Sequence, residues 1–300
     1  MIVVIGSANL DLIATVERLP RPGETVPGDS FSTAPGGKGA NQALAARRAG
    51  ADVRMVGAVG RDAFAAEALA LLREGGVDLS AMREADTATG IAVILVEEGG
   101  ENVIAIVPGG NGTVAPADVA AAGLQAGDHL MLQLEIPLET VAAALDTARE
   151  AGAVSLLNTA PFRAEAVKLL PQADVVVANE TEFDLYAEAL ALAGGGREEK
   201  IKDFCERTGR KIVVTLGADG VAAAAPEGFF RADGLAIEPV DTVGAGDTFC
   251  GYLAASLAGG LPLPDALRRA AAAGSLACLK PGAQPSIPFA SEVDAALPRS

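Results

Sequence analysis

The segment best suited to chemistry is Asp241-Thr242-Val243-Gly244-Ala245-Gly246-Asp247-Thr248-Phe249. Apolar residues at helical spacing follow it (Thr248–Leu257), and Leu235–Val240 before it resembles the end of a strand. The first N–H groups of a helix have no partner within the helix and carry a partial positive charge. The small residues of this turn keep side chains out of the way, so an anion can approach those N–H groups closely.

Asp247 gives this turn a chemistry beyond anion binding. A carboxylate beside an anion cradle is poorly suited to holding the anion, but it can take a proton from a hydroxyl that attacks a phosphoryl group. The segment therefore favours phosphoryl transfer, with Asp247 next to an anion hole at Gly244, Ala245 and Gly246. An ordinary helix start, capped by Asp241 or Thr242, explains the same residues and remains an alternative at this point.

A second glycine-rich turn, Pro35–Gln42, enters a predicted helix at Ala40–Ala49. Its glycines permit close approach of the backbone, Lys38 supplies a cation, and Asn41 presents an amide on the first helical turn. The spacing differs from that of a Walker loop, which needs a lysine followed by serine or threonine. A flexible turn with a solvated lysine is the alternative interpretation.

Further polar residues follow predicted strands. Asn9 and Asp11 come after the apolar strand Ile2–Ile5, and Glu135 follows Leu130–Leu134. Such groups suit the hydroxyls of a sugar, although an Asx-rich turn also accounts for Asn9 and Asp11. Three more loops complete the set, and they are Asn179–Glu182, Thr215–Gly220 and Lys280–Ser286. The acidic groups at 180 and 182 either cap a helix or order water around Mg²⁺, and the glycine turn at 217–220 could lie along a nucleotide.

The elements that must position these residues alternate regularly from about residue 128. Expected strands are Leu130–Leu134, Ala153–Leu157, Asp174–Ala178 and Lys211–Leu216; expected helices are Asp62–Gly75, Leu138–Ala151, Arg163–Leu170, Thr181–Leu192 and Glu198–Thr208. Alternation of this kind predicts an α/β fold with a mostly parallel sheet and helices on both faces. Ligands of such sheets bind at the carboxyl ends of the strands, where the polar loops fall.

One stretch breaks the alternation. Ile91–Val96 and Val103–Val107 flank a turn at 97–102 and predict a hairpin, and Ala14–Ala34 can add strands to it. Together these segments predict a small sheet standing off the main body. Because its apolar residues need covering, a second subunit or a bound ligand is expected there.

Composition excludes several classes of protein. The formal net charge is −16 over 300 residues, with no Lys or Arg from 84 to 148, so no basic footprint for nucleic acid is visible. A single histidine, His129, excludes a Ser-His-Asp triad elsewhere. Cys205, Cys250 and Cys278 are too widely spaced for a metal cluster and odd in number, which favours a reducing compartment. With no signal-peptide pattern and no long apolar run, we expect a soluble cytoplasmic protein.

These residues resemble the ribokinase (PfkB-type) sugar kinase family from end to end. The segments Gly36–Gln42 and Asp241–Thr248 are similar to its two signatures. The resemblance implies a ribokinase-like three-layer α/β sandwich in one domain, 1–300, with a small β-sheet lid at roughly 12–35 and 90–107. It also implies that the lid closes the sugar site and pairs two subunits into a homodimer.

The resemblance assigns roles to particular residues. Asp247 is the general base, and the N–H groups around Gly244, Ala245 and Gly246 form the anion hole. The implied sugar ligands are Asn9, Asp11, Gly37, Lys38, Gly39, Ala40, Asn41, Glu135 and Asp247. The implied ATP contacts are Asn179, Thr215, Leu216, Gly217, Ala218, Asp219, Gly220, Gly246 and Asp247. Glu182 matches the family residue that supports Mg²⁺, through water, and the implied K⁺ positions are Asp241, Val243, Ala277, Lys280, Gly282 and Ser286. The family often has His or Asn where Ala271 stands, and Ala271 offers adenine no hydrogen bond.

The expected activity is ATP-dependent transfer of a phosphoryl group to the 5-hydroxyl of D-ribose. Alternatives within the family are kinases for deoxyribose, another sugar or a nucleoside. A non-catalytic sugar-binding sensor is the alternative from another class, since a fold does not fix a function. A dinucleotide oxidoreductase is disfavoured because the first strand leads into Gly6-Ser7-Ala8-Asn9 without the required glycine spacing.

Overall fold

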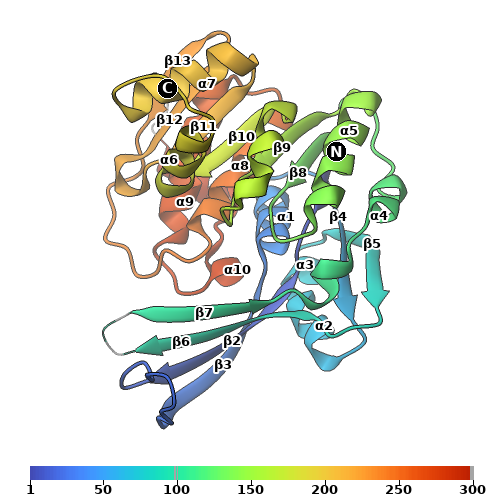
Figure 1. Cartoon of the computed structure of the whole chain (residues 1–300), viewed down its shortest axis with the longest axis vertical. Coiled ribbons are helices and arrows are strands. Elements are labelled where there is room, and N and C mark those ends of the chain that lie inside the picture. The colour runs from blue at the N-terminus through green and yellow to red at the C-terminus, as the bar shows by residue number, and fades with distance from the viewer. Residues whose placement is uncertain (98, 100, 298–300) are drawn as a thin grey trace.

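A nine-stranded sheet forms the centre of the molecule (Figure 1) in the computed structural model, which describes residues 1–97, 99 and 101–297. Seven neighbouring strands run parallel, and two antiparallel strands complete one edge. In spatial order the strands are β13 (Gly228–Ala232), β12 (Val221–Ala225), β11 (Lys211–Thr215), β10 (Val175–Asn179), β9 (Val154–Asn158), β8 (His129–Leu132), β1 (Ile2–Ile5), β4 (Val53–Gly60) and β5 (Asp78–Ala85).

Helices cover both faces of this sheet, because its central strands are apolar on both sides. In β1, Ile2 and Val4 belong to one buried cluster, and Val3 and Ile5 belong to the other. The first cluster lies under α1 (Lys38–Arg48), α2 (Ala63–Ala68), α3 (Ala70–Glu74), α8 (Ala245–Ala258), α9 (Leu263–Ala277) and α11 (Ala290–Ala296). The second lies under α4 (Pro116–Ala121), α5 (Leu138–Ala151), α6 (Glu180–Ala189) and α7 (Arg197–Thr208). The predicted three-layer α/β architecture is confirmed.

A four-stranded sheet projects from the main body, as Figure 1 shows. Its spatial order is β3 (Gly28–Gly36), β2 (Asn9–Val16), β6 (Gly90–Glu97) and β7 (Asn102–Val107). The expected hairpin is β6–β7, and residues 98 and 100 of its turn lie outside the described residues. β2 begins at Asn9, so Asn9 and Asp11 stand on a strand rather than in a turn.

Three local predictions were wrong. Leu235–Val240 forms no strand, because β13 already completes this edge of the sheet and Pro239 has no N–H to donate. Arg163–Leu170 forms 3₁₀ turns at Ala164–Lys168 and Leu170–Gln172, where Pro171 prevents continuation as an α-helix. The helix expected at Asp62–Gly75 is divided at Leu69 into α2 and α3.

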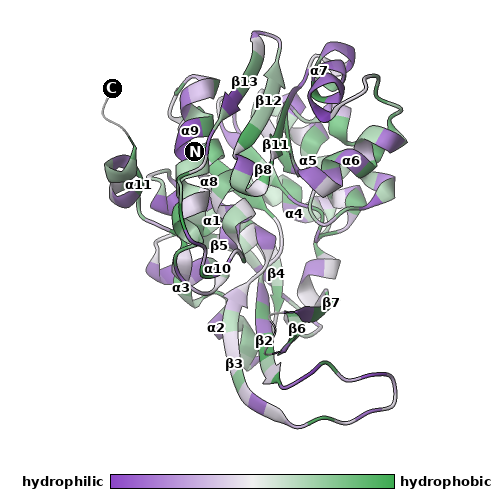
Figure 2. Ribbon diagram, turned by 90° about the vertical axis from the view of Figure 1, so that its left-hand side faces the viewer, coloured by the Kyte–Doolittle hydropathy of each residue, from purple (hydrophilic) through white to green (hydrophobic). Residues whose placement is uncertain are grey.

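Figure 2 shows how hydropathy follows this arrangement. β11 and β12 are largely apolar, whereas most residues of α7, which lies at the surface, are charged. None of the helices in the described part of the chain combines the length and apolar character needed to cross a bilayer.

Candidate active site

The polar residues singled out in the sequence gather at one edge of the large sheet. β1, β8, β9, β10 and β11 are parallel, so their carboxyl ends lie along the same edge. Residues that end or follow these strands include Glu135 after β8, Asn158 on β9, Asn179 on β10 and Thr215 on β11. The N-terminal ends of α1 and α8 complete the edge, since Asn41 on α1 contacts Asp247 on α8.

The start of α8 has the geometry expected of an anion hole. Gly244 adopts a left-handed conformation, with φ of 77°, and its carbonyl accepts from Thr248 N–H. A Cβ on Gly244 would lie 2.8 Å from Ala283, so this position also needs glycine for space. Among the residues that the structure describes, the N–H groups of Gly246 and Asp247 have no acceptor. Gly246 is exposed, and a ligand can therefore reach these donors.

Asp247 is buried, and neutral amides hold both of its oxygens. Asn41 Nδ2 donates to Oδ2 at 2.9 Å, and Gln42 Nε2 donates to Oδ1 at 2.9 Å. Asp247 also raises the pKa of the half-buried Lys38 ammonium, and burial of the lysine opposes this effect. A carboxylate with these neighbours is oriented, remains close to a cation, and can exchange a proton with a bound hydroxyl.

Glu135 lies on the Lys38 side of the same edge. One of its oxygens accepts from Ser7 Oγ and from the backbone N–H of Lys38, the latter at 2.9 Å. Burial raises the pKa of the nearby Asp11 carboxyl to about 6, with a smaller contribution from the charge of Glu135. Two acceptor carboxylates and a lysine therefore occupy one small region, which suits a polyhydroxylated ligand.

The second glycine turn packs directly on the loop after β1. Gly37 has φ of 89°, and a Cβ on Gly39 would lie 2.5 Å from the backbone nitrogen of Ser7. The N–H of Gly39 donates to Ser7 Oγ, and that of Ala40 donates to the Ser7 carbonyl at 2.8 Å. Ala40 is completely buried, so of the predicted sugar ligands it has neither side chain nor N–H available.

Asn111, which the sequence reasoning missed, holds the first predicted sugar ligand. It is almost fully buried on a 3₁₀ turn (Gly109–Thr113) that follows β7. Its Nδ2 donates to Asn9 Oδ1 at 2.6 Å, and its Oδ1 accepts from Ala8 N–H at 2.9 Å. Gly109-Gly110 directly before it was the available signal, because it marks a turn at the end of the small sheet.

A cavity of about 400 Å³ lies on the other side of the α8 N-terminus. Its walls include residues from the irregular segment that was expected to be a strand, Leu235 and Ile237, and the side chains of Phe249 and Ala271. Of the predicted ATP contacts, Thr215, Gly217, Ala218, Gly220 and Gly246 line the cavity. Leu216, Asp219, Asn179 and Asp247 do not. An apolar slot ending at a helix N-terminus has the shape and polarity to hold a base next to its phosphates.

Asn179 and Glu182 form a reciprocal cap at the start of α6. Glu182 N–H donates to Asn179 Oδ1 at 2.8 Å, and Asn179 N–H donates to Glu182 Oε2 at 3.1 Å. Thr159 Oγ1 also donates to Oε2 at 3.3 Å. The capping interpretation is therefore correct for Glu182, whereas Glu180 pairs with Arg197 at 3.1 Å. The cap leaves Oε1 of Glu182 for another partner.

Asp241 joins the two loops predicted to surround a monovalent cation. Its Oδ1 accepts from Val243 N–H at 3.0 Å, and its Oδ2 accepts from Gly282 N–H at 2.7 Å. Ala277 ends α9, Lys280 pairs with Glu292, and Ser286 lies at the end of the short helix α10 (Ala283–Ser286). Four of the six predicted positions, 241, 243, 280 and 282, thus lie in loops, and the other two are the last residues of helices. No cluster of three or more His, Cys, Asp or Glu side chains suited to a metal occurs among the described residues.

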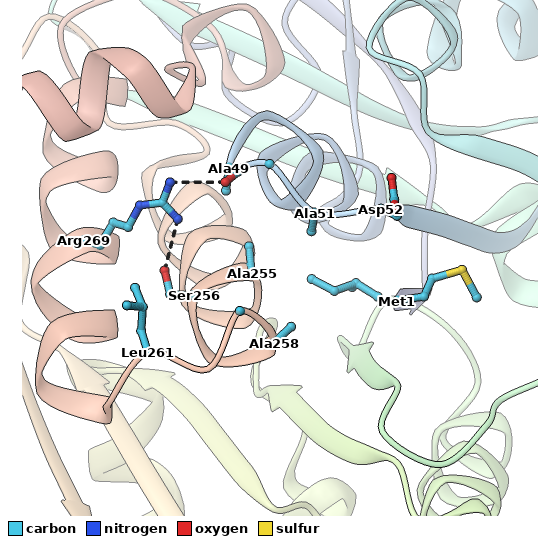
Figure 3. Close-up of a pocket in the computed structure, with 12 residues that line it drawn as sticks. Met1, Ala49, Ala51, Asp52, Ala255, Ser256, Ala258, Leu261 and Arg269 are labelled. Atoms are coloured by element: carbon cyan, nitrogen blue, oxygen red, sulfur yellow. Dashed lines mark hydrogen bonds between the residues drawn. The ribbon is translucent and has the colours of Figure 1, made fainter.

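A further hollow of about 500 Å³ lies at the amino ends of the strands (Figure 3). Arg269 crosses it, donating to the Ala49 carbonyl at 3.2 Å and to Ser256 Oγ at 3.4 Å. None of the predicted site residues lines this hollow, and its charged groups, Arg269, Asp52 and the Met1 ammonium, already have protein partners. It is therefore separate from the candidate site.

Comparison with known proteins is consistent with this geometry. The model of the pfkB family carbohydrate kinases matches residues 1–290. Ribokinase of Lactococcus lactis is 38% identical over 297 residues, covering 98% of this chain and 96% of that protein. The crystal structure of ribokinase from Thermotoga maritima has a TM-score of 0.89 at 29% identity, covering 98% of each chain. The Arabidopsis thaliana ribokinase complexed with ribose and ATP has a TM-score of 0.86 at 31% identity, covering 100% of this chain and 99% of that one. The family model and the full-length relatives place this chain in the pfkB family of carbohydrate kinases.

Proposed function

We propose that this protein transfers the γ-phosphoryl group of ATP to the 5-hydroxyl of D-ribose. One observation carries the proposal: the N-terminus of α8 separates two binding regions. Gly246 lines the apolar cavity on one side, and Asp247 contacts the Asn41 and Lys38 side on the other. A phosphoryl group that crosses from nucleotide to sugar passes the free N–H groups of this turn.

In this proposal the sugar lies between the two glycine turns. Asn9, Asp11 and Glu135 bind its hydroxyls, and Lys38, Asn41 and the backbone of Gly37 complete the set of ligands. Gly39, also predicted as a ligand, is buried and its N–H already donates to Ser7 Oγ. Asp247 takes the proton from the attacking hydroxyl as the new P–O bond forms. At the predicted anion hole, Gly244–Gly246, the free N–H groups of Gly246 and of the adjacent Asp247 stabilise the charge on the transferring phosphoryl oxygens, which is the larger contribution in this class of reaction. The Ala245 N–H already donates to the Thr242 carbonyl at 3.3 Å.

ATP is proposed to lie in the cavity of about 400 Å³, with its phosphates directed to Gly246. Thr215 to Gly220 would follow the nucleotide, and the base would pack against apolar residues. Ala271 is among these walls and gives the base van der Waals contact alone. Asn179 sits at the start of α6, on the sheet edge between the sugar and nucleotide regions.

Two cations are part of the proposal. Glu182 would hold Mg²⁺ through water, because its Oε1 has no role in the α6 cap and hydrated Mg²⁺ is usual in phosphate sites. Mg²⁺ neutralises charge on the transferring phosphates when it is bound. K⁺ would be held by Asp241, Val243, Ala277, Lys280, Gly282 and Ser286, mainly through carbonyls. Support for this placement is that Asp241 joins the two loops, accepting from the N–H groups of Val243 and Gly282.

The small sheet is proposed as the lid of a single domain spanning 1–300. Segments at roughly 12–35 and 90–107 would close over the sugar and exclude water, which competes with the sugar as phosphoryl acceptor. Several apolar side chains of β7 are exposed, including those of Ile104 and Ile106. A second copy of this chain is the proposed cover, which makes the protein a homodimer.

Release of ADP from Mg·ATP tests the proposal. Ribose, deoxyribose, fructose, adenosine and 2-keto-3-deoxygluconate would each be supplied with K⁺ and, separately, with Na⁺. Fast turnover on ribose, faster in K⁺, is expected. Preference for another acceptor would mean that the protein is a kinase with a different substrate. Sugar binding without any turnover would mean that it is a non-catalytic sugar-binding sensor.

A further inference from the structure

Gln42 is a completely buried amide at the centre of the candidate site, between α1 and the sheet. Its Nε2 donates to Asp247 Oδ1 at 2.9 Å and to Asn158 Oδ1 at 3.2 Å. Its Oε1 accepts from Gln133 Nε2 at 2.7 Å. Burying an amide is costly unless its hydrogen bonds are made, so a residue that makes all of these contacts is held in one arrangement.

Gln133 and the Asp247 carboxylate, which only accepts, together determine which end of the Gln42 amide faces Asp247. The Oε1 atom of Gln133 is itself buried without a hydrogen-bond partner among the described residues. An amide has one accepting end and one donating end. Since Gln133 donates to the accepting end, the donating end of Gln42 must point to Asp247 and Asn158. Gln133 follows β8 and Asn158 ends β9, so the orientation is anchored on the rigid sheet.

We propose that Gln42 is a positioning residue for phosphoryl transfer, fixing the rotation of the Asp247 carboxylate through a relay that starts at Gln133. This inference rests on the proposed role of Asp247 as general base. Asn41 binds the other oxygen of Asp247, so the carboxylate is held on both sides by uncharged donors. Neutral donors orient it and leave its charge free to attract the proton.

A test of Gln42 must distinguish its effect on the pH dependence from the effects of the other titratable groups around Asp247. Lys38 is the nearby cation, and Glu135 and Glu182 contribute smaller effects on its pKa. Cys250 lies on α8 one turn after Asp247, and burial holds the pKa of its thiol well above the usual range. None of these groups changes when Gln42 is replaced, so a new pH dependence would come from the substituted side chain.

Gln42→Glu places a carboxylate against Asp247 with almost no change of shape. Repulsion between the two groups favours sharing a proton, and the acid limb of the kcat profile should move up by about one pH unit or more. Gln42→Met keeps the length without the donor, and kcat should fall about ten- to a hundredfold as the carboxylate loses its orientation. Ribose and ATP KM should change little in both variants.

Thr140→Val is the matched control, because Thr140 is buried and donates to the Val114 carbonyl away from the site. Thermal melts would show that each variant is folded. An unmoved acid limb in folded Gln42→Glu would overturn the inference, and so would wild-type kcat in Gln42→Met. A shift in the control equal to that in Gln42→Glu would overturn it as well.

Gln133→Met tests the relay separately, since it removes the donor to Gln42 and touches neither Asp247 nor the proposed ligands. A fall in kcat at constant KM is expected, and unchanged kcat would contradict the relay. Asp247→Asn distinguishes failure of the positioning role of Gln42 from failure of Asp247 as the general base. If that variant is inactive while the Gln42 variants behave normally, only the positioning role fails; if it is active, the proposed base fails.

Discussion

Individual residues of the candidate site are arranged so that each acidic group has a different neighbourhood. Asp247 is bound by two amides, Glu135 by a hydroxyl and a backbone N–H, and Asp11 is half-buried near Glu135. These differences predict different consequences when each carboxylate is changed.

Glu135→Ala should raise the KM for the sugar far more than the KM for ATP. The side chain lies on the Lys38 side of α8, whereas the nucleotide cavity lies on the other. Loss of hydrogen bonds to a charged acceptor should raise the sugar KM by about tenfold or more. Steady-state kinetics with each substrate varied would measure this, with the exposed Glu139→Ala as control. Equal effects on both KM values would show that Glu135 is not a sugar ligand.

Asp11 predicts a pH dependence of sugar binding. Burial raises its pKa to about 6, so the carboxylate that accepts from sugar hydroxyls is ionised above this pH and lost below it. The sugar KM should therefore rise as pH falls through about 6, while ATP KM stays flat. Asp11→Asn should have a raised sugar KM without this dependence. If the sugar KM of Asp11→Asn rises in the same way at low pH, the pH dependence comes from another group.

At the level of elements, the proposed reaction depends on how α8 begins. Its first turn is fixed by Gly244 in a left-handed conformation against α10. The sequence predicted this helix start and the one at α1, because glycines, a charged residue and an apolar period coincide there. It could not predict that Leu235–Val240 lines a cavity, since an apolar run looks the same whether it faces a sheet or a ligand.

Gly244→Ala should reduce both stability and kcat. A left-handed alanine with its Cβ 2.8 Å from Ala283 should lower the free energy of unfolding by about 1–3 kcal/mol. It should also displace the N–H groups of Gly246 and Asp247, which lowers kcat. Gly123→Ala is the matched control, with φ of 64° and no atom within 4 Å of the added Cβ. Chemical denaturation and kcat would be measured for both. Full activity in Gly244→Ala would contradict an anion hole at this turn.

In the whole molecule, the two sheets meet at the side of the site where the sugar is proposed to bind. Asn111, after β7, is hydrogen-bonded to Ala8 and Asn9, and these bonds join the end of the small sheet to the first predicted ligand. The sequence indicated both sheets and the loops at the strand ends. It did not indicate Asn111, Gln133 or Asn158, because a buried amide has no periodic signature and its partners lie far away in the chain.

If the exposed apolar side chains of β7 form the dimer interface, a charge introduced among them should dissociate the two subunits. Ile104 is 52% exposed in the single chain, and Ile104→Asp should convert the proposed dimer to monomer because the buried carboxylate would be unpaired. Leu185→Asp on α6, at a residue 41% exposed, is the control and should leave the assembly unchanged. Sedimentation velocity over a range of concentrations would measure this. A wild-type monomer at every concentration would remove the dimer from the account.

Asp247→Asn tests whether Asp247 takes the proton from the sugar hydroxyl. Ribose and ATP affinities would be measured by calorimetry and turnover by ADP release on the same preparation. We predict that both ligands still bind, since Asn9, Glu135 and the nucleotide cavity are unchanged, and that turnover falls about 10²–10⁴-fold. Near-normal turnover in this variant would show that Asp247 is not the general base.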